Sequence, residues 1–96
     1  MEIILSKDPR ENTLITFDGN VVEYFSASSR SSARFHVAHI ASFGITTNPQ
    51  GKNFLSAASK YSGTILLAGV AIRDEALAAA RGLVGAVQRG MAEYPP

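Results

Sequence analysis

His36 and His39, three positions apart in the segment RFHVAHI, are the residues whose type could bind a metal ion. On a helix this spacing would bring two ligands to one side, whereas in a strand it sends the two side chains to opposite faces. The segment alternates as a strand does. The chain has no cysteine, and no carboxylate lies between Glu23 and Asp74. A full ligand set is therefore not assembled, and we expect two unrelated histidines, no metal site and no cofactor.

Nucleophilic catalysis and phosphate binding lack a motif as well. The ten serines show no Gly-x-Ser-x-Gly arrangement around a nucleophile. The stretch GVAIRDEALAAARG has neither the Walker nor the dinucleotide-binding spacing of glycines. We therefore expect no enzymatic activity, and a small hydrolase or metal protein is the least favoured class of function.

The serine-rich stretch SASSRSSAR, residues 26–34, is where an anion site would lie. Its low apolar content predicts a mobile loop. Arg30 and Arg34 stand among five serines, an arrangement that suits contact with a phosphate group or a phosphorylation site. A solvated loop without a ligand is the alternative. Arg30 and Arg34 are the candidate anion-binding residues.

Length and charge exclude several other classes. The chain has 96 residues, which predicts one domain spanning 1–96, and its net charge is +1. Binding to duplex DNA or RNA needs a strong basic excess, so we expect no nucleic-acid partner. The start, MEIILSKDPRE, does not resemble a secretory signal. The longest apolar run, ILLAGVAI, is far shorter than the ~20 residues of a membrane-spanning helix. We expect a soluble, cytoplasmic protein, with weak support for contact with a membrane surface.

The stretch TFDGNVVEYF, residues 16–25, predicts a β-hairpin. Asp-Gly is the strongest signal for a two-residue type I′ turn, in which both central residues need positive φ. The loop is Asp18-Gly19 or Gly19-Asn20, and both registers place the same apolar side chains on one face. That face belongs to the core, while Thr16 and Glu23 face solvent. The core residues of the hairpin are then Ile15, Phe17, Val22 and Tyr24.

The rest of the chain predicts more strands and one helix. We expect an N-terminal strand or arm over 1–12, antiparallel strands over 13–72 and a C-terminal helix over 74–93. Residues 64–72 are apolar throughout, so a helix that starts near Thr64 competes with a strand there. Asp74 is a good helix N-cap. Inward-facing residues are Phe35 and Val37, Phe43 and Ile45 in the strands, and Leu77, Ala80, Val84, Val87 and Met91 in the helix.

Small residues recur every four positions along the predicted helix. They lie opposite the apolar stripe, and they are Ala78, Gly82, Ala86 and Gly90. Because a glycine inside a helix costs about 1 kcal/mol relative to alanine, this row favours close approach of another backbone. We expect an interaction surface there, in a homo-oligomer or with a partner domain. The alternative is that this helix face binds no partner and that the fold merely tolerates its small residues.

The quoted hairpin carries a resemblance to a known superfold. TLITFDGNVVEY resembles the opening hairpin of small bacterial pleckstrin-homology-like (PH-like) domains of unassigned function, and RFHVAHIASFGI resembles two of their strands. The resemblance implies a mainly β, α+β fold: a bent antiparallel sheet, or partly open barrel, capped by a C-terminal helix. Its members bind lipids, peptides or other proteins. The phosphoinositide binders carry several Lys and Arg around the first hairpin loop, whereas that loop here is the short, acidic FDGN.

These observations favour a non-enzymatic interaction module. We expect a protein partner or self-association. The alternative is a peripheral lipid-binding or anion-binding domain that uses the serine- and arginine-rich segment 26–34.

Overall fold

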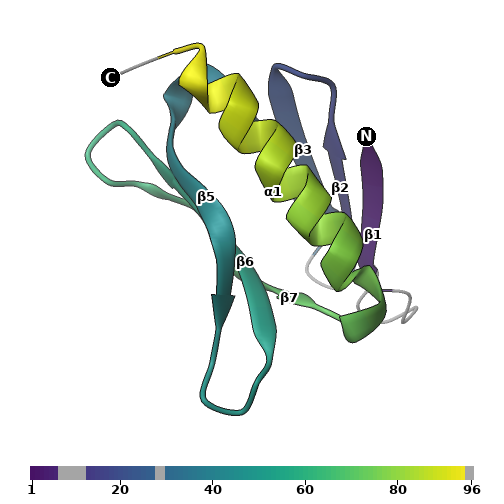
Figure 1. Cartoon of the computed structure of the whole chain (residues 1–96). Helices are drawn as coiled ribbons and strands as arrows, with labels where there is room; N and C mark the ends of the chain where they lie inside the picture. The colour runs from purple at the N-terminus through teal and green to yellow at the C-terminus, as the bar shows by residue number, and fades with distance from the viewer. Residues whose placement is uncertain (7–12, 28–29, 95–96) are drawn as a thin grey trace.

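A computed structural model describes residues 1–6, 13–27 and 30–94. They form two antiparallel sheets and one C-terminal helix, so the expected α+β class is confirmed (Figure 1). The first sheet has the order β1-β2-β3-β4 and the second β5-β6-β7. The strands are β1 (Glu2–Ser6), β2 (Thr13–Phe17), β3 (Val21–Ser26), β4 (Ser31–His36), β5 (Ile40–Thr47), β6 (Asn53–Ser59) and β7 (Ile65–Ile72).

The β2–β3 hairpin adopts one of the two expected registers. Phe17 pairs with Val22, and the Asp18 nitrogen donates to the Val21 carbonyl at 3.3 Å, which leaves Gly19-Asn20 as the loop. Gly19 has φ +106° and Asn20 has no positive φ. A positive φ at the first central residue alone is the pattern of a type II′ turn, so the expected type I′ turn is wrong.

The Asp18 side chain stabilises this turn through hydrogen bonds to the backbone. One carboxylate oxygen accepts hydrogen bonds from the backbone nitrogens of Asn20 and Val21, each at 2.8 Å. These two bonds, with a smaller contribution from the Arg34 charge, lower the pKa of Asp18 below its ordinary value of 3.8. The turn therefore forms from local chemistry, and the acidic residue is part of the scaffold.

The expected loop over 26–34 is wrong for most of its length. Ser26 ends β3 and Ser31 begins β4, and every β4 residue faces a partner in β3. Only 27–30 connect the strands, and residues 28–29 lie outside the described residues. The serines lack an apolar pattern of their own, but β3 offers them a neighbouring row of backbone donors and acceptors. Pairing to an existing strand decides the outcome here.

Residues 65–72 are strand β7, so the alternative of a helix from Thr64 is wrong. Gly69 has φ +86° at a point where the β6–β7 register shifts between Leu55 and Ser56. A glycine with positive φ at an irregular ladder step is typical of a β-bulge. The burial of β7 is mixed: Leu67 and Ile72 are buried, whereas Ile65 is exposed.

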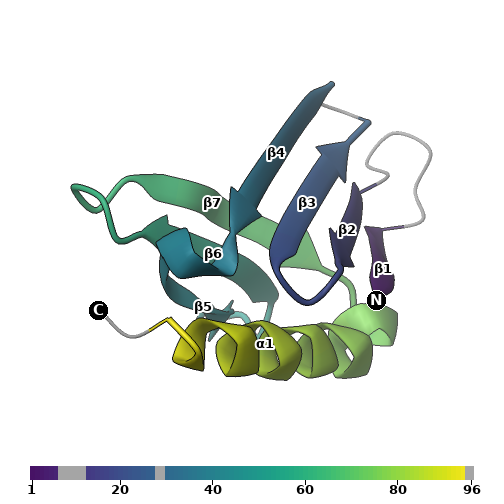
Figure 2. The ribbon, with the colours of Figure 1, turned by 90° about the horizontal axis from the view of Figure 1, so that it is seen from above.

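The helical segment starts with a 3₁₀ turn, Asp74–Ala76, and continues as α1, Leu77–Ala92. No side chain caps either start, so the expected Asp74 cap is wrong. The helix lies across the opening between the two sheets, with β5 along one side and β1, β2 and β3 along the other (Figures 1 and 2). Ala80 and Val87 of the expected stripe are fully buried, and so is Leu83, which was not part of it.

The apolar band of α1 is broad because the helix lies between the two sheets. Because sheets flank the helix on both sides, residues beside the central stripe also pack against the core. These half-buried residues are Leu77, Val84, Ala86 and Met91. The Gln88 side chain donates to the Phe43 carbonyl of β5 at 3.0 Å. The helix thereby covers the outer edge of β5.

Replacing Asp18 with asparagine keeps the acceptor oxygen and removes the charge. We expect Asp18→Asn to unfold at lower urea concentration than the parent at pH 7. Since the folded-state pKa is lowered, the charge stabilises the fold above pH 3.8 and loses its effect as the pH falls through the folded pKa. Urea midpoints of both proteins between pH 7 and about pH 2 measure this. A difference that stays constant over that range contradicts the prediction.

Candidate functional site

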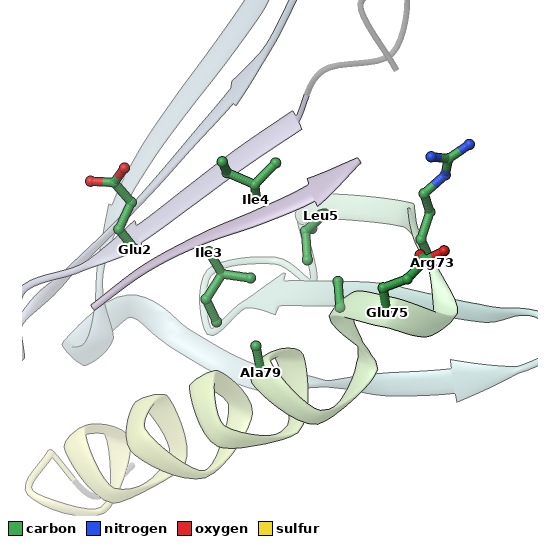
Figure 3. Close-up of a pocket in the computed structure, with 8 residues that line it drawn as sticks. Glu2, Ile3, Ile4, Leu5, Arg73, Glu75 and Ala79 are labelled. Carbon is green, nitrogen blue, oxygen red and sulfur yellow. The ribbon is translucent and has the colours of Figure 1, made fainter. Parts of the chain in front are cut away.

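A groove runs between β1 and the start of the helical segment (Figure 3). Its volume is about 360 Å³. It is lined by Glu2, Ile3, Ile4, Leu5, Arg73, Glu75, Ala76 and Ala79. Strand β1 is the outermost strand of its sheet, so one wall of the groove is a sheet edge and the other is a helix.

The hydrogen-bonding alternation of β1 leaves part of its backbone facing away from β2. Met1 and Phe17 exchange two hydrogen bonds, each 2.8 Å long. In an antiparallel ladder the next hydrogen-bonded pair is two residues on, at Ile3. The N–H and C=O groups of Glu2 and Ile4 therefore point to the free edge. The open stretch ends at Leu5, whose carbonyl accepts a hydrogen bond from the Arg73 nitrogen at 3.4 Å.

The groove is apolar at its base and charged at its ends. Ile3 and Leu5 are buried and point toward the helix, while Glu2 and Ile4 point to the opposite face of the strand (Figure 3). Ala76 and Ala79 offer only methyl groups to the groove. Glu2 is exposed at one end, and Arg73 is exposed at the other beside Glu75. The groove therefore places a hydrogen-bonding strand edge opposite a helical wall of small side chains.

The outer face of the first sheet carries an apolar row next to the groove. Ile4 pairs with Leu14, and Leu14 pairs with Phe25, so the three side chains lie side by side across three strands. Ile4 is 47% exposed and Phe25 is 42% exposed. Adjacent exposed apolar side chains on a sheet face are typical of a contact surface.

The two candidate anion residues lie in different parts of the β3–β4 hairpin. Arg30 lies in the β3–β4 turn with φ +51° and lines a shallow depression with Phe25 and Leu14. Arg34 lies in β4 directly opposite Glu23. Four residues of extended chain separate their α-carbons by about 13 Å, and Glu23 offers Arg34 an opposite charge.

The two histidines lie on the same side of the chain, so the expected opposite faces are wrong. The strand ends at His36, and a 3₁₀ turn follows over Val37–His39. Three residues per turn bring positions i and i+3 together, and the ring centroids are 6.1 Å apart. His36 Nδ1 accepts a hydrogen bond from the Ala38 nitrogen at 3.0 Å, which caps the turn.

The histidine rings belong to a short chain of aromatic contacts. His36 meets the Tyr94 ring edge-on at 5.3 Å, and His39 meets the Tyr61 ring at 5.4 Å. Lys60 Nζ donates to the Tyr94 carbonyl at 2.6 Å and so holds the end of the helical segment. Within residues 1–6, 13–27 and 30–94, no three histidine or carboxylate residues gather as a metal-ligand set. The same residues include no helix long and apolar enough to cross a bilayer.

The small-residue row of α1 does not lie on one face. Ala78 and Gly82 are exposed, while Ala86 and Gly90 are half-buried. A residue repeated every four positions advances by about 40° per step around a helix of 3.6 residues per turn, so the row winds from solvent toward the first sheet. A Cβ at Gly90 would lie 3.4 Å from the Gly19 carbonyl oxygen. Gly90 therefore belongs to the packing of the β2–β3 turn against the helix.

The sequence indicated β1 but not its groove. The signal was present in part: alternation in EIIL places Ile3 and Leu5 on one face and Glu2 and Ile4 on the other. Which neighbour covers a strand edge depends on how distant segments pack, and Arg73 and Ala79 come from the far end of the chain.

The first hairpin of the sheet is β1–β2, so the FDGN turn is the second connection of the sheet. The first connection includes residues 7–12, which lie outside the described residues.

Comparison of the chain with protein-family models, curated protein sequences and solved structures gives no match.

The two ends of the small-residue row should respond differently to the same substitution. Gly90→Leu is expected to lower the free energy of unfolding by about 2 kcal/mol, because its side chain meets Phe17, Gly19 and Val37. Gly82→Leu is the matched control. Nothing lies within 4 Å of a Cβ there, so the gain in helix propensity should raise the free energy of unfolding by about 0.8 kcal/mol. Urea denaturation measures both, and equal effects would contradict the placement of Gly90.

Proposed function

We propose that this protein is a PH-like, non-enzymatic interaction domain that binds an extended protein segment along β1. The order of elements supports the PH-like assignment: a four-stranded sheet, a three-stranded sheet and a closing C-terminal helix. This order agrees with the resemblance carried by the TLITFDGNVVEY hairpin. Since a fold hosts many functions, the function is argued from the β1 groove.

The observation that carries the proposal is the free edge of β1 within that groove. Glu2 and Ile4 each present a backbone donor and a backbone acceptor away from β2. Such an edge is a template for another strand, and proteins use it to bind extended peptides. The main-chain bonds supply affinity, and the charged ends of the groove supply selectivity. The apolar row of Ile4, Leu14 and Phe25 extends the contact surface over the sheet face.

The edge of β5 is a poorer candidate because the helix already covers it. Gln88 donates to the Phe43 carbonyl, which takes up one acceptor that an added strand would use. The anion-binding alternative has less support than strand addition. It needs Arg30 and Arg34 to act together, and the structure separates them along the β3–β4 hairpin with Glu23 opposite Arg34.

A proline at position 4 tests strand addition. The Ile4 nitrogen faces the free edge, so Ile4→Pro removes a donor that an added strand needs while leaving the β1–β2 ladder intact. Ten-residue peptides selected from a random display library on the immobilised protein serve as probes. We expect the selected peptides to bind Ile4→Pro at least tenfold more weakly than the parent, as measured by isothermal titration calorimetry.

Ile4→Thr is the control because it keeps the backbone donor and a β-branched side chain. Its affinity for the selected peptides should stay within about threefold of the parent, since the net value of one lost apolar contact is below that of the lost edge. Urea midpoints establish that both variants are folded. No enrichment of peptides on a protein that stays at the mass of one chain, or equal binding to Ile4→Pro and the parent, would overturn the proposed function.

A further inference from the structure

We infer that the occupant of the β1 groove is a second copy of this chain. Its β1 would pair antiparallel with β1 and join two four-stranded sheets into one continuous sheet. This inference rests on the proposed function, because it names the partner for the same groove. Three features of the groove favour a second copy: the backbone pattern of β1, the charges at the two ends and the small side chains of the helical wall.

The backbone pattern of β1 is complementary to itself. With a twofold axis passing between the two Ile3 residues, Glu2 of one copy lies opposite Ile4 of the other, and the reverse pair forms across the axis. Glu2 and Ile4 are the residues whose N–H and C=O groups face the free edge. Both pairs are then hydrogen-bonded pairs of the new ladder, and each exchanges two bonds. No donor or acceptor of the open stretch is left without a partner.

The charges at the ends of the groove are complementary to themselves as well. Glu2 is at one end of β1, and Arg73 is at the other, where its nitrogen bonds to Leu5. An antiparallel copy reverses these ends, so each Glu2 carboxylate comes to the Arg73 end of the other copy. Glu75 beside Arg73 limits this attraction but does not remove it, because the Arg73 side chain extends away from the helix (Figure 3). A twofold contact makes the same charge pair twice.

The surroundings of β1 allow the β1 strand of a second copy to approach its free edge, and the symmetry of the contact limits the assembly to two copies. No strand among the described residues pairs with β1 beyond its edge. The end of β7 and the 3₁₀ turn lie beside β1 at the Arg73 end, where Glu75 joins Ala76 and Ala79 in the helical wall of the groove. Each copy has one β1, and the contact uses the same edge on both sides. A contact of this isologous kind closes on itself, so the sheet does not grow further.

Molar mass in solution tests the inference. Light scattering after size exclusion is measured over a wide range of loading concentrations. We expect the parent protein to approach twice the chain mass of 10.2 kDa as concentration rises. Ile4→Pro should remain at the mass of one chain at every concentration, and Ile4→Thr should form the dimer.

Charge reversal gives a second test that leaves the backbone unchanged. Arg73→Glu places two carboxylates at the end that receives Glu2, so the dissociation constant of the dimer should rise at least tenfold. Adding Glu2→Lys to Arg73→Glu should restore most of the affinity by recreating an opposite-charge pair. Arg81→Glu is the matched control: it makes the same charge change at an exposed position that does not line the groove, and the dissociation constant should not change.

The outcomes separate this inference from the proposed function. A parent protein at the mass of one chain at all concentrations overturns the second copy as occupant. The proposed function still holds in that case if selected peptides bind the parent but not Ile4→Pro. A dimer that persists in both Ile4→Pro and Arg73→Glu lies elsewhere on the molecule and overturns this inference. Failure of Glu2→Lys to restore a dimer lost in Arg73→Glu also overturns it.

Discussion

The burial of one helical stripe between the two sheets is the interaction on which the rest of the structure depends. Ala80, Leu83 and Val87 have no exposed surface. The described strands form two separate ladders, so α1 is the element that packs against the inner faces of both. A fully buried leucine side chain contributes about 2 kcal/mol, which is a large part of the ~5–15 kcal/mol that stabilises a small domain. Contacts at Gln88 and Gly90 then set the helix against β5 and the β2–β3 turn.

A single helix that closes two open sheets leaves some strand edge uncovered. The helix has 16 residues, and its length follows β5, where Gln88 bonds to the strand. At its start, the segment near β1 is a 3₁₀ turn followed by small side chains, and it bonds to β1 only through the Arg73 nitrogen. The edge of β1 is therefore left uncovered because the single helix that closes the core runs along β5. Short length and a charged residue are features that limit unspecific pairing of an exposed strand edge, and β1 has five residues and carries Glu2.

The sequence predicted the parts of the fold that depend on neighbours in the chain. The β2–β3 hairpin and its core face follow from alternation and from the turn residues, and the helix follows from its apolar period. Pairing between distant segments decided the rest. Ser31–Arg34 became a strand because β3 supplied partners, and His36 met His39 because a 3₁₀ turn interrupted the alternation. Leu83 is buried beside the expected Ala80 and Val87 because two sheets flank the helix, which a one-dimensional period does not encode.

The proposed recognition through a strand edge does not require a sequence motif. The affinity of an added strand comes mainly from backbone groups, which every residue except proline possesses. Only side chains at the ends and the wall of the groove need particular chemistry, namely Glu2, Arg73 and Ala79. These residues are far apart in the sequence and are ordinary in type. The proposed recognition depends on geometry and a few charges, so it rests on the hydrogen-bonding pattern of β1 and not on any short run of residues.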